Sequence, residues 1–325
     1  MNRIKTAVIG VGYLGKFHAE KYSLLPEAEL VAVCDTDQQR ANEIATRLGV
    51  RSYTDYQQLA GQVEAVTIAV PTLLHYEVAK FFLSQGIHVL LEKPIATTVP
   101  EAEELVKLAK KRQLILQIGH LERFNTVMRA LYKILEQPVF IESYRLAPFR
   151  PRGTDVNVVL DLMIHDIDII QDIVGASIIN IVANGAPVLS PEIDIANARL
   201  QFANGCVANV TASRISVDVI RKLRIFQHDA YITVNLHNKK LTVRRKGHNE
   251  MFPGIPEIVS EEQAFGQGDA LRDEVAAFLE AIRNGTPPLV SGEAGTQALA
   301  TALRITDIVT KQSAHFANAA ATYEK

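Results

Sequence analysis

Short apolar runs alternate with amphipathic stretches over the first 118 residues of the chain. Continuous apolar runs such as Ala65–Val70 and Ile87–Leu91 are typical of strands that are buried on both faces of a parallel sheet. The stretches between these runs repeat their apolar residues at helical spacing. The pattern predicts strands at 4–9, 30–34, 51–53, 65–70, 87–91 and 114–118, and helices at 14–24, 38–48, 73–85 and 99–112. This alternation predicts an α/β fold built on a doubly wound parallel sheet.

The pattern changes beyond Gly119. Helices are predicted over Leu121–Gln137 and Val158–Val174, with a strand over Val139–Leu146 between them. Apolar and polar residues then alternate, as in an antiparallel sheet with one covered face. These strands are predicted at 178–187, 196–202, 207–215, 222–226, 231–236 and 241–245, and closing helices near 269–284 and 293–311. We therefore expect a first domain at residues 1–119. The second, at 120–325, is an α+β domain with a large open, mainly antiparallel sheet, and its last helices are candidates for packing back on the first domain.

Composition limits the partners of the chain. Its 325 residues are 48% hydrophobic, enough for two domains with sizeable cores. The net charge of −2, with both signs interspersed, argues against a nucleic-acid or membrane surface. Cys34 and Cys206 lie in apolar strand-like runs, as reduced core thiols do. No signal peptide or membrane-length run is visible, so we expect a cytoplasmic protein.

A glycine-rich turn is the first candidate site. Gly10, Gly12 and Gly15 form a G-x-G-x-x-G pattern between the first strand and the first helix. Gly10 permits a tight turn, Gly12 leaves room for a pyrophosphate, and Gly15 lets the helix lie close to the strand. Free N–H groups at the helix N-terminus then face the phosphates. The turn, including Tyr13 and Leu14, predicts a dinucleotide-binding Rossmann domain.

Asp35 indicates which dinucleotide binds. It ends the second strand 20 residues after Gly15, where a carboxylate accepts hydrogen bonds from both ribose hydroxyls. A 2′-phosphate needs a basic partner there, but Thr36 and Asp37 follow, and Arg40 comes a turn later. Because a carboxylate repels a phosphate, the sequence favours NAD over NADP. Asp35 is also compatible with a cap for the following helix.

Two further segments leave strands at the edge where such sheets bind ligands. The segment Glu92-Lys93-Pro94 directs the ammonium of Lys93 toward the expected nicotinamide, although a surface lysine is the alternative. Glu92 either orients Lys93 or simply ends the strand. Pro71-Thr72 and His75 follow the strand at 65–70 and are expected against the cofactor, although His75 is equally compatible with a helix surface.

Several donors are candidates for substrate binding. His120, Arg123 and Asn125 follow the last parallel strand and suit a hydroxylated substrate or its phosphates. Arg123 is equally suited to pairing with a helix carboxylate. Arg150 and Arg152 lie in a polar loop and face either an anionic substrate or solvent.

Asp161, His165 and Asp168 recur at i, i+4 and i+7 of one predicted helix, and therefore share a face. A carboxylate one turn from an imidazole holds its tautomer and raises its basicity, as in general-base pairs. A purely structural hydrogen bond is the alternative. These residues with His120 are also metal-ligand types, but no tight ligand spacing is present, and we expect no metal site.

Four motifs stand in order along the chain: Gly10-x-Gly12-x-x-Gly15-x-x-His18, Pro71-Thr72-x-x-His75, Glu92-Lys93-Pro94 and Asp161-x-x-x-His165. In this combination the chain resembles the Gfo/Idh/MocA oxidoreductase family (glucose–fructose oxidoreductase, inositol dehydrogenase and relatives). The resemblance implies an NAD-binding domain at 1–119 and a substrate-binding and oligomerisation domain at 120–325. It further implies a homodimer or homotetramer, and it implies that Lys93, Asp161 and His165 surround the reacting carbinol.

One segment departs from the common family pattern. Many members carry a glycine-rich stretch before the Asp-x-x-x-His helix, whereas this chain has Asp155-Val156-Asn157-Val158-Val159. With Gly119–Asn125, this stretch looks most like the branch that acts on nucleotide sugars. The resemblance thus implies oxidation of the 3-hydroxyl of UDP-N-acetylglucosamine to a ketone.

The resemblance leaves the base and the substrate open. His165 is favoured as the base, with Asp161 as its orienter and Lys93 as a donor to the hydroxyl. The ordinary pKa of histidine, about 6.5, lies nearer pH 7 than that of lysine, about 10.4, which suits a general base. Lys93 is the alternative base, because burial and a nicotinamide cation both depress its pKa. Alternative functions are a dehydrogenase of a free polyol, inositol or aldose, a reductase, and a non-catalytic NAD-sensing protein.

Overall fold

The structure is a computed structural model that describes residues 3–149, 156–266 and 268–323. The chain divides into two compact units. The first unit comprises residues 1–124 and 269–299, and the second comprises residues 125–268 and 300–325. No helix in the described ranges combines the length and the apolar character that crossing a membrane requires.

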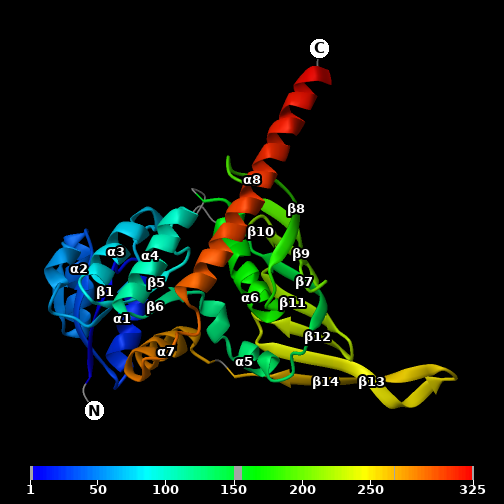
Figure 1. The fold of residues 1–325 in the computed structure, drawn as a ribbon, viewed down its shortest axis with the longest axis horizontal. Coiled ribbons are helices and arrows are strands. Elements are labelled where there is room, and N and C mark those ends of the chain that lie inside the picture. The colour runs from blue at the N-terminus through cyan, green and yellow to red at the C-terminus, as the bar shows by residue number, and fades with distance from the viewer. Residues whose placement is uncertain (1–2, 150–155, 267, 324–325) are drawn as a thin grey trace. The chain divides into compact units, whose positions relative to one another are not determined.

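The first unit contains a six-stranded parallel sheet with the strand order β3-β2-β1-β4-β5-β6 (Figure 1). Its strands are β1 (Ile4–Ile9), β2 (Ala28–Cys34), β3 (Arg51–Tyr53), β4 (Ala65–Ile68), β5 (His88–Glu92) and β6 (Leu116–Gly119). Its helices are α1 (Gly15–Leu24), α2 (Gln38–Leu48), α3 (His75–Ser84), α4 (Val99–Arg112) and α7 (Ala270–Asn284), with short 3₁₀ turns at Tyr56–Leu59, Thr72–Leu74 and Leu121–Phe124. The predicted doubly wound sheet is confirmed.

Local signals explain where these helices begin and end. The Asp37 side chain accepts from the backbone of Arg40 at the start of α2, and Gly49 ends that helix in the left-handed region. Thr98 and Glu101 form a reciprocal capping box at the start of α4. The helix cap after β2 is therefore Asp37, and Asp35 remains outside it.

A buried cluster joins α7 to the rest of the first unit. Val275, Phe278 and Leu279 of α7 pack with Val8 of β1 and Tyr22 of α1, and all five are fully buried. A helix that lies late in the sequence thus completes the core beneath the glycine-rich turn.

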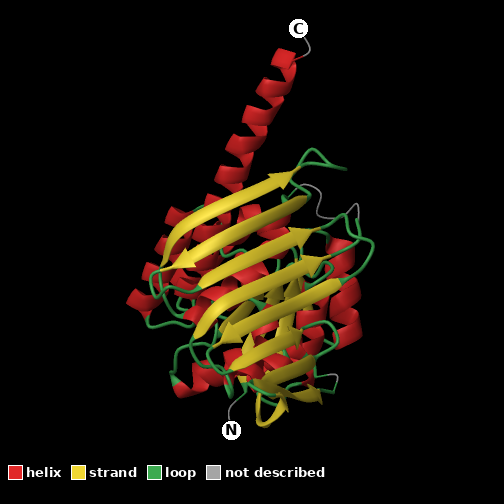
Figure 2. Ribbon diagram, turned by 90° about the vertical axis from the view of Figure 1, so that its right-hand side faces the viewer, coloured by secondary structure: helices red, strands yellow, loops and turns green. Residues whose placement is uncertain are grey.

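The second unit contains an eight-stranded sheet with the strand order β14-β13-β12-β11-β7-β10-β9-β8. All pairs are antiparallel except β7 with β10. Figure 2 looks onto a face of this sheet on which no helix of the described residues lies. The strands are β7 (Pro138–Leu146), β8 (Ile178–Ala186), β9 (Ile195–Phe202), β10 (Val207–Ser213), β11 (Ile220–Gln227), β12 (Ala230–Asn235), β13 (Lys240–Phe252) and β14 (Ile255–Ala264). The predicted large, mainly antiparallel sheet is confirmed.

Four elements beyond β6, namely α5, β13, β14 and α8, differ from the prediction. The helix expected over 121–137 is shorter, because Asn125 interrupts it and caps α5 (Thr126–Tyr132). Strand β13 runs on to Phe252 and pairs with β14, which was not predicted. The residues of β14 are almost all exposed, so they carry no alternation between buried and exposed positions. Helix α8 (Gly292–Tyr323) extends beyond the predicted end at residue 311.

The predicted helix over 158–174 is also divided. Its first turn is a π-helix, Val159–Met163, and α6 (Ile164–Val174) continues from it. The Asn157 side chain accepts from the backbone N–H groups of Val159 and Leu160 and caps this π turn. A π turn changes the angular spacing that a continuous α-helix gives to its side chains.

Two buried ion pairs fix the second unit around this helix. Arg145 of β7 donates two hydrogen bonds, of 2.9 and 2.8 Å, to the two carboxylate oxygens of Asp166 on α6. Arg214 donates from Nε to Asp194 at 2.7 Å and from a terminal nitrogen to the carbonyl of Val156 at 2.6 Å. Buried charges are stable only with such partners. The second pair therefore anchors the chain just before Asn157.

We predict that Asp194→Asn destabilises the second unit by about 3 kcal/mol, because Arg214 would remain buried without its counter-ion. Burial alone would raise the pKa of Asp194, but hydrogen bonds from Arg214, from Ser190 and from backbone N–H groups hold it far below its ordinary 3.8. The carboxylate thus stabilises the folded chain above pH 3.8, and that contribution is lost as the pH falls further. Urea unfolding at pH 7 and near pH 3 measures both effects. An equal loss at both pH values contradicts this account.

Candidate active site

The glycine-rich turn has the geometry of a phosphate cradle. Gly10 adopts a φ of +80°, and a Cβ there would lie 2.7 Å from the carbonyl oxygen of Ala69. A Cβ on Gly15 would lie 1.7 Å from the carbonyl oxygen of Gly10, so α1 can approach the turn only without a side chain there. Among the residues that the structure describes, no atom lies within 4 Å of a Cβ built on Gly12. That open space fits a pyrophosphate against the backbone, as the G-x-G-x-x-G turn requires. Tyr13 and Leu14 in the same turn are largely exposed.

Asp35 lies at the end of β2 and is 7% exposed. One carboxylate oxygen accepts from the backbone of Val11 at 2.9 Å, and the other accepts from the backbone of Asp37 at 3.0 Å. Arg40 pairs with the same carboxylate at 3.2 Å and also with Asp37. These contacts fix the Asp35 carboxylate beside the glycine-rich turn, and they hold the nearest cation in an ion pair.

His75 connects two loops of the first unit. Pro71 precedes the 3₁₀ turn that begins at Thr72, and His75 begins α3. Its Nδ1 lies 2.7 Å from the carbonyl oxygen of Pro94, and its Nε2 lies 2.9 Å from that of Val70. Burial lowers the pKa of His75, although both carbonyl oxygens favour the charged ring. The imidazole is 1% exposed, so the helix-surface alternative is wrong, and His75 ties the Lys93-Pro94 step to the end of β4.

Glu92 ends β5, and its carboxylate is held on two sides. The Nε2 of His18 on α1 donates to Oε1 at 2.8 Å, and the backbone N–H of Lys93 donates to Oε2 at 3.3 Å. A Cβ on Gly119 of the neighbouring strand would lie 3.0 Å from the same Oε2 and 3.2 Å from the Cα of Glu92, so a side chain there would crowd this carboxylate. Burial alone would raise the pKa of Glu92, but His18 and Lys93 outweigh it and lower the pKa. Glu92 thus does more than end the strand, because it ties the backbone of Lys93 to α1.

The segment after β6 is buried. His120 is 1% and Arg123 is 4% exposed, and both belong to the first unit. Asn125 belongs to the second unit, where its amide donates to the carbonyl of Leu236 and accepts from the backbone of Val127. The carboxamide of Asn125 therefore serves as a helix cap in this structure.

Asp161, His165 and Asp168 come from two different helical segments. Asp161 lies in the π turn, whereas His165 and Asp168 lie on α6. Asp161 and His165 are partly exposed, and Asp168 is buried. In a continuous α-helix the three side chains would share one face. Because Asp161 lies in the π turn, its direction relative to His165 and Asp168 differs from that arrangement. Arg150 and Arg152 lie outside the described residues.

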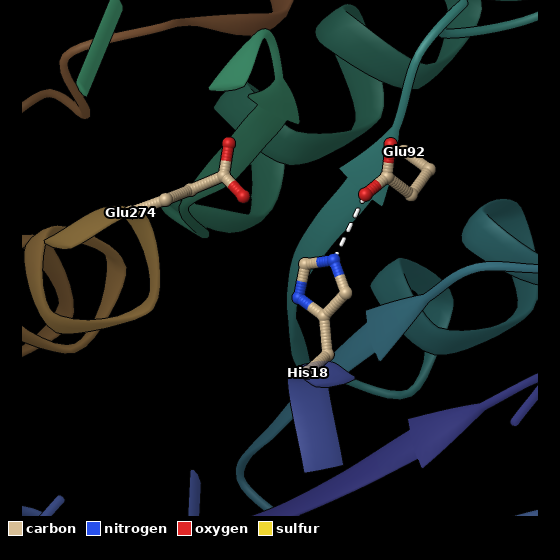
Figure 3. A group of neighbouring side chains, drawn as sticks. All are labelled: His18, Glu92 and Glu274. Carbon is tan, nitrogen blue, oxygen red and sulfur yellow. Dashed lines mark hydrogen bonds and ion pairs between the residues drawn. The ribbon is translucent and has the colours of Figure 1, made fainter. Parts of the chain in front are cut away.

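The sequence analysis did not identify the buried acid Glu274 of α7 as a site residue. Its carboxylate points toward His18 and Glu92 (Figure 3). One ligand atom of each of these three residues lies within 4.8 Å of the other two. Two unit charges at that distance repel by about 3 kcal/mol at an effective dielectric constant of about 20. The sequence did contain a sign of this buried acid. Glu274 occupies one position of the otherwise apolar face of its helix, which consists of positions 271, 274, 275, 278, 279 and 282.

Comparisons with known proteins cover nearly the whole chain. The model of an oxidoreductase family with an NAD-binding Rossmann fold matches residues 4–120, and the model of the C-terminal alpha/beta domain of the same family matches residues 150–314. The UDP-N-acetylglucosamine 3-dehydrogenase of Acidithiobacillus ferrooxidans is 38% identical over 94% of this chain and 97% of its own. A solved structure of that enzyme aligns with a TM-score of 0.90 and 37% identity, over 95% of this chain and 98% of its own. The myo-inositol 2-dehydrogenase of Thermotoga maritima is 25% identical over 91% of this chain and 93% of its own.

Gly12→Ala and Gly15→Ala form a matched pair that tests the cradle. The methyl group of Gly15→Ala would clash with the Gly10 carbonyl, so we expect a loss of about 1–3 kcal/mol of stability together with weaker NAD binding. The methyl group of Gly12→Ala meets no atom of the described ranges, so we expect stability to change by less than about 0.5 kcal/mol. The NAD affinity of this variant should still fall by about tenfold or more, because the methyl group fills the pyrophosphate space. Thermal unfolding and calorimetric titration measure the two effects. Undiminished NAD binding by the Gly12 variant contradicts the assignment.

Proposed function

Because the chain belongs to the Gfo/Idh/MocA oxidoreductase family, we propose that it oxidises the 3-hydroxyl of UDP-N-acetylglucosamine to a ketone with NAD⁺. The observation that carries the choice of substrate is the 38% identity to a UDP-N-acetylglucosamine 3-dehydrogenase over 94% of the chain. The open space at Gly12 and the carboxylate of Asp35 support the choice of cofactor.

In this proposal the first unit binds the dinucleotide. The backbone around Gly12 receives the pyrophosphate, where free N–H groups at the start of α1 favour negative charge. Tyr13, Leu14 and Gly15 complete this turn, and Pro71, Thr72 and His75 shape the neighbouring loop. When bound, NAD⁺ accepts the hydride from the sugar carbon.

The chain's own side chains handle the proton. His165 accepts it from the reacting hydroxyl, and Asp161 orients the imidazole. Lys93 donates a hydrogen bond to the same oxygen and stabilises the negative charge that develops there. His120 and Arg123, with Arg150 and Arg152, are the proposed donors to the sugar and its phosphates.

Asp35 favours NAD over NADP in this proposal. Its carboxylate accepts from the ribose hydroxyls of NAD, whereas a 2′-phosphate would face the same negative charge. Arg40 is the nearest cation that could offset that repulsion, but its guanidinium pairs with Asp35 and Asp37.

We further propose that copies of the chain associate as dimers or tetramers through the open face of the eight-stranded sheet. Val182 of β8 and Ile195 of β9 lie on the same face of these two paired strands and are 50% and 36% exposed. Exposed apolar side chains on a broad sheet face are typical of protein interfaces. Sedimentation in solution tests the proposal, and a monomer at micromolar concentration overturns it.

Lys93→Ala and His165→Ala test the catalytic assignment. We expect each to lower kcat by about 10²–10⁴-fold, since each removes a group that handles the proton or the developing charge. Lys107→Ala and His237→Ala are the controls, because both side chains are exposed on other elements. Reduction of NAD⁺ is followed by absorbance with UDP-N-acetylglucosamine, other UDP-sugars, myo-inositol and free aldoses. Full turnover by both test variants contradicts the catalytic assignment. Turnover with a free polyol or sugar but not with UDP-sugars shows that the protein is a polyol, inositol or aldose dehydrogenase instead.

Asp35→Ser tests the cofactor preference. We expect NAD affinity to fall by about 10–100-fold, because hydrogen bonds to a charged acceptor contribute about 1.5–3 kcal/mol. NADP affinity should rise, because the repulsive charge is gone and Arg40 keeps only its ion pair with Asp37. Calorimetric titration of both cofactors measures the ratio. A preference for NADP in the unchanged protein contradicts the proposal outright.

A further inference from the structure

Three ionisable side chains from three elements meet inside the first unit (Figure 3). They are His18 of α1, Glu92 at the end of β5 and Glu274 of α7. His18 and Glu274 are 1% and 0% exposed, and the side chain of Glu92 is 14% exposed. Glu274 has no part in the chemistry proposed above, yet a buried acid is costly unless it has a partner or a proton.

The hydrogen bonds of the cluster are unevenly distributed. Both oxygens of Glu92 accept hydrogen bonds, one from the imidazole of His18 and the other from the backbone of Lys93. Among the described residues, neither carboxyl oxygen of Glu274 has a hydrogen-bond partner. The backbone carbonyl oxygen of Glu274 accepts a hydrogen bond from the side chain of Gln117 at 3.1 Å.

The charges decide which acid holds a proton. Burial raises the pKa of Glu274 well above its ordinary value, and the neighbouring charge of Glu92 raises it further. Glu92 is driven the other way, because His18, Lys93 and His75 favour its carboxylate. The same contrast of environments separates the two carboxyl groups of acid–base pairs in enzymes.

Other titratable groups around the cluster do not change this assignment. Tyr22 of α1 lies near Glu274, and burial raises its pKa, so the phenol stays neutral. The Tyr22 hydroxyl forms a 2.8 Å hydrogen bond with the hydroxyl of Thr67 on β4. His75 and Lys93 act on Glu92, and their positive charges would only strengthen the contrast.

We propose that Glu274 carries a proton in the native protein, and that this uncharged acid lets Glu92 remain the carboxylate that positions Lys93. Glu274 and His18 are then positioning residues. His18 ties Glu92 to α1, the helix that opens at the glycine-rich turn, and Glu92 ties the backbone of Lys93. Two hydrogen bonds thus connect the cofactor turn to the lysine. The inference rests on the role proposed above for Lys93.

A bound divalent cation is the rival occupant, because the three side chains are also ligand types for zinc. The geometry favours the proton. The Nε2 of His18 and the Oε1 of Glu92 lie 2.8 Å apart and already share a hydrogen, whereas a zinc ion would have to separate them. Zinc ligands lie about 2.0–2.2 Å from the metal in a tetrahedral arrangement, which puts any two of them about 3.3 Å or more apart.

Infrared difference spectra test the proton directly and need no turnover. At pH 7 we expect the unchanged protein to show the carbonyl stretch of a buried carboxylic acid, and Glu274→Gln to lack it. Glu280→Gln is the control, because Glu280 is exposed on the same helix and should leave that band in place. Equal spectra for the unchanged protein and the Glu274 variant overturn the proposal. Stoichiometric zinc binding to the unchanged protein that Glu274→Gln abolishes also overturns it, in favour of a metal site.

A titration of the same band tests whether the two acids are coupled. In Glu92→Gln the repulsion between them is gone, so the acid band of Glu274 should disappear at a lower pH than in the unchanged protein. If the acid band titrates identically in both proteins, the charge of Glu92 does not favour the protonated form of Glu274, and the proposed coupling is wrong.

The pH profile of kcat/KM tests the link to Lys93. A carboxylate stabilises a neighbouring cation, so its loss should move the basic limb of this profile to lower pH. The shift should be larger in Glu92→Gln/Glu274→Gln than the sum of the two single shifts. Each single variant keeps one ionisable acid in the cluster, whereas the double variant keeps none. Additive shifts overturn the positioning role. If the protein turns over no sugar, the proposed function fails while the infrared results still stand.

Discussion

The close approach of α1 to the turn after β1 is the constraint on which the first unit depends. A single Cβ at Gly15 would lie 1.7 Å from the Gly10 carbonyl, so the helix reaches this position only because that residue is bare. Once there, its N-terminus faces the open space at Gly12, and one turn later it presents His18 to Glu92. The same contact thus shapes the phosphate cradle and fixes the strand end that carries Lys93.

The fold of the first unit could be predicted because its signals are local. A few consecutive residues are enough to predict a continuous apolar strand, a helix cap or the glycine-rich turn. The parallel sheet predicted from them was confirmed. The second unit was harder to predict in detail. The exposed residues of β14 show no alternation between apolar and polar positions. The apolar pattern predicted a helix over residues 121–137, but Asn125 caps α5 and makes the helix shorter. Periodicity also gave no sign of the π turn that contains Asp161.

The candidate site shows a similar limit. The residues around the cofactor turn were found because the motif places them on consecutive elements. Glu274 was missed because it lies about 180 residues after Glu92, and only folding brings the two acids together. The buried pair Arg214 and Asp194 was also missed, because only the pairing of β9 with β10 brings the two residues together, although the pair anchors the chain before the π turn. The roles of Lys93, Asp161 and His165 in catalysis remain predictions, and family membership is confirmed.

The proposed function requires that a hydride passes from C3 of the sugar to the nicotinamide. The most direct measurement uses UDP-N-acetylglucosamine deuterated at C3 with NAD⁺ and this protein, and determines the isotope content of the reduced cofactor by mass spectrometry. The account predicts one deuterium in every reduced nicotinamide and a 3-keto sugar in equal amount. Reduced cofactor without deuterium, or no reduction at all, would contradict it.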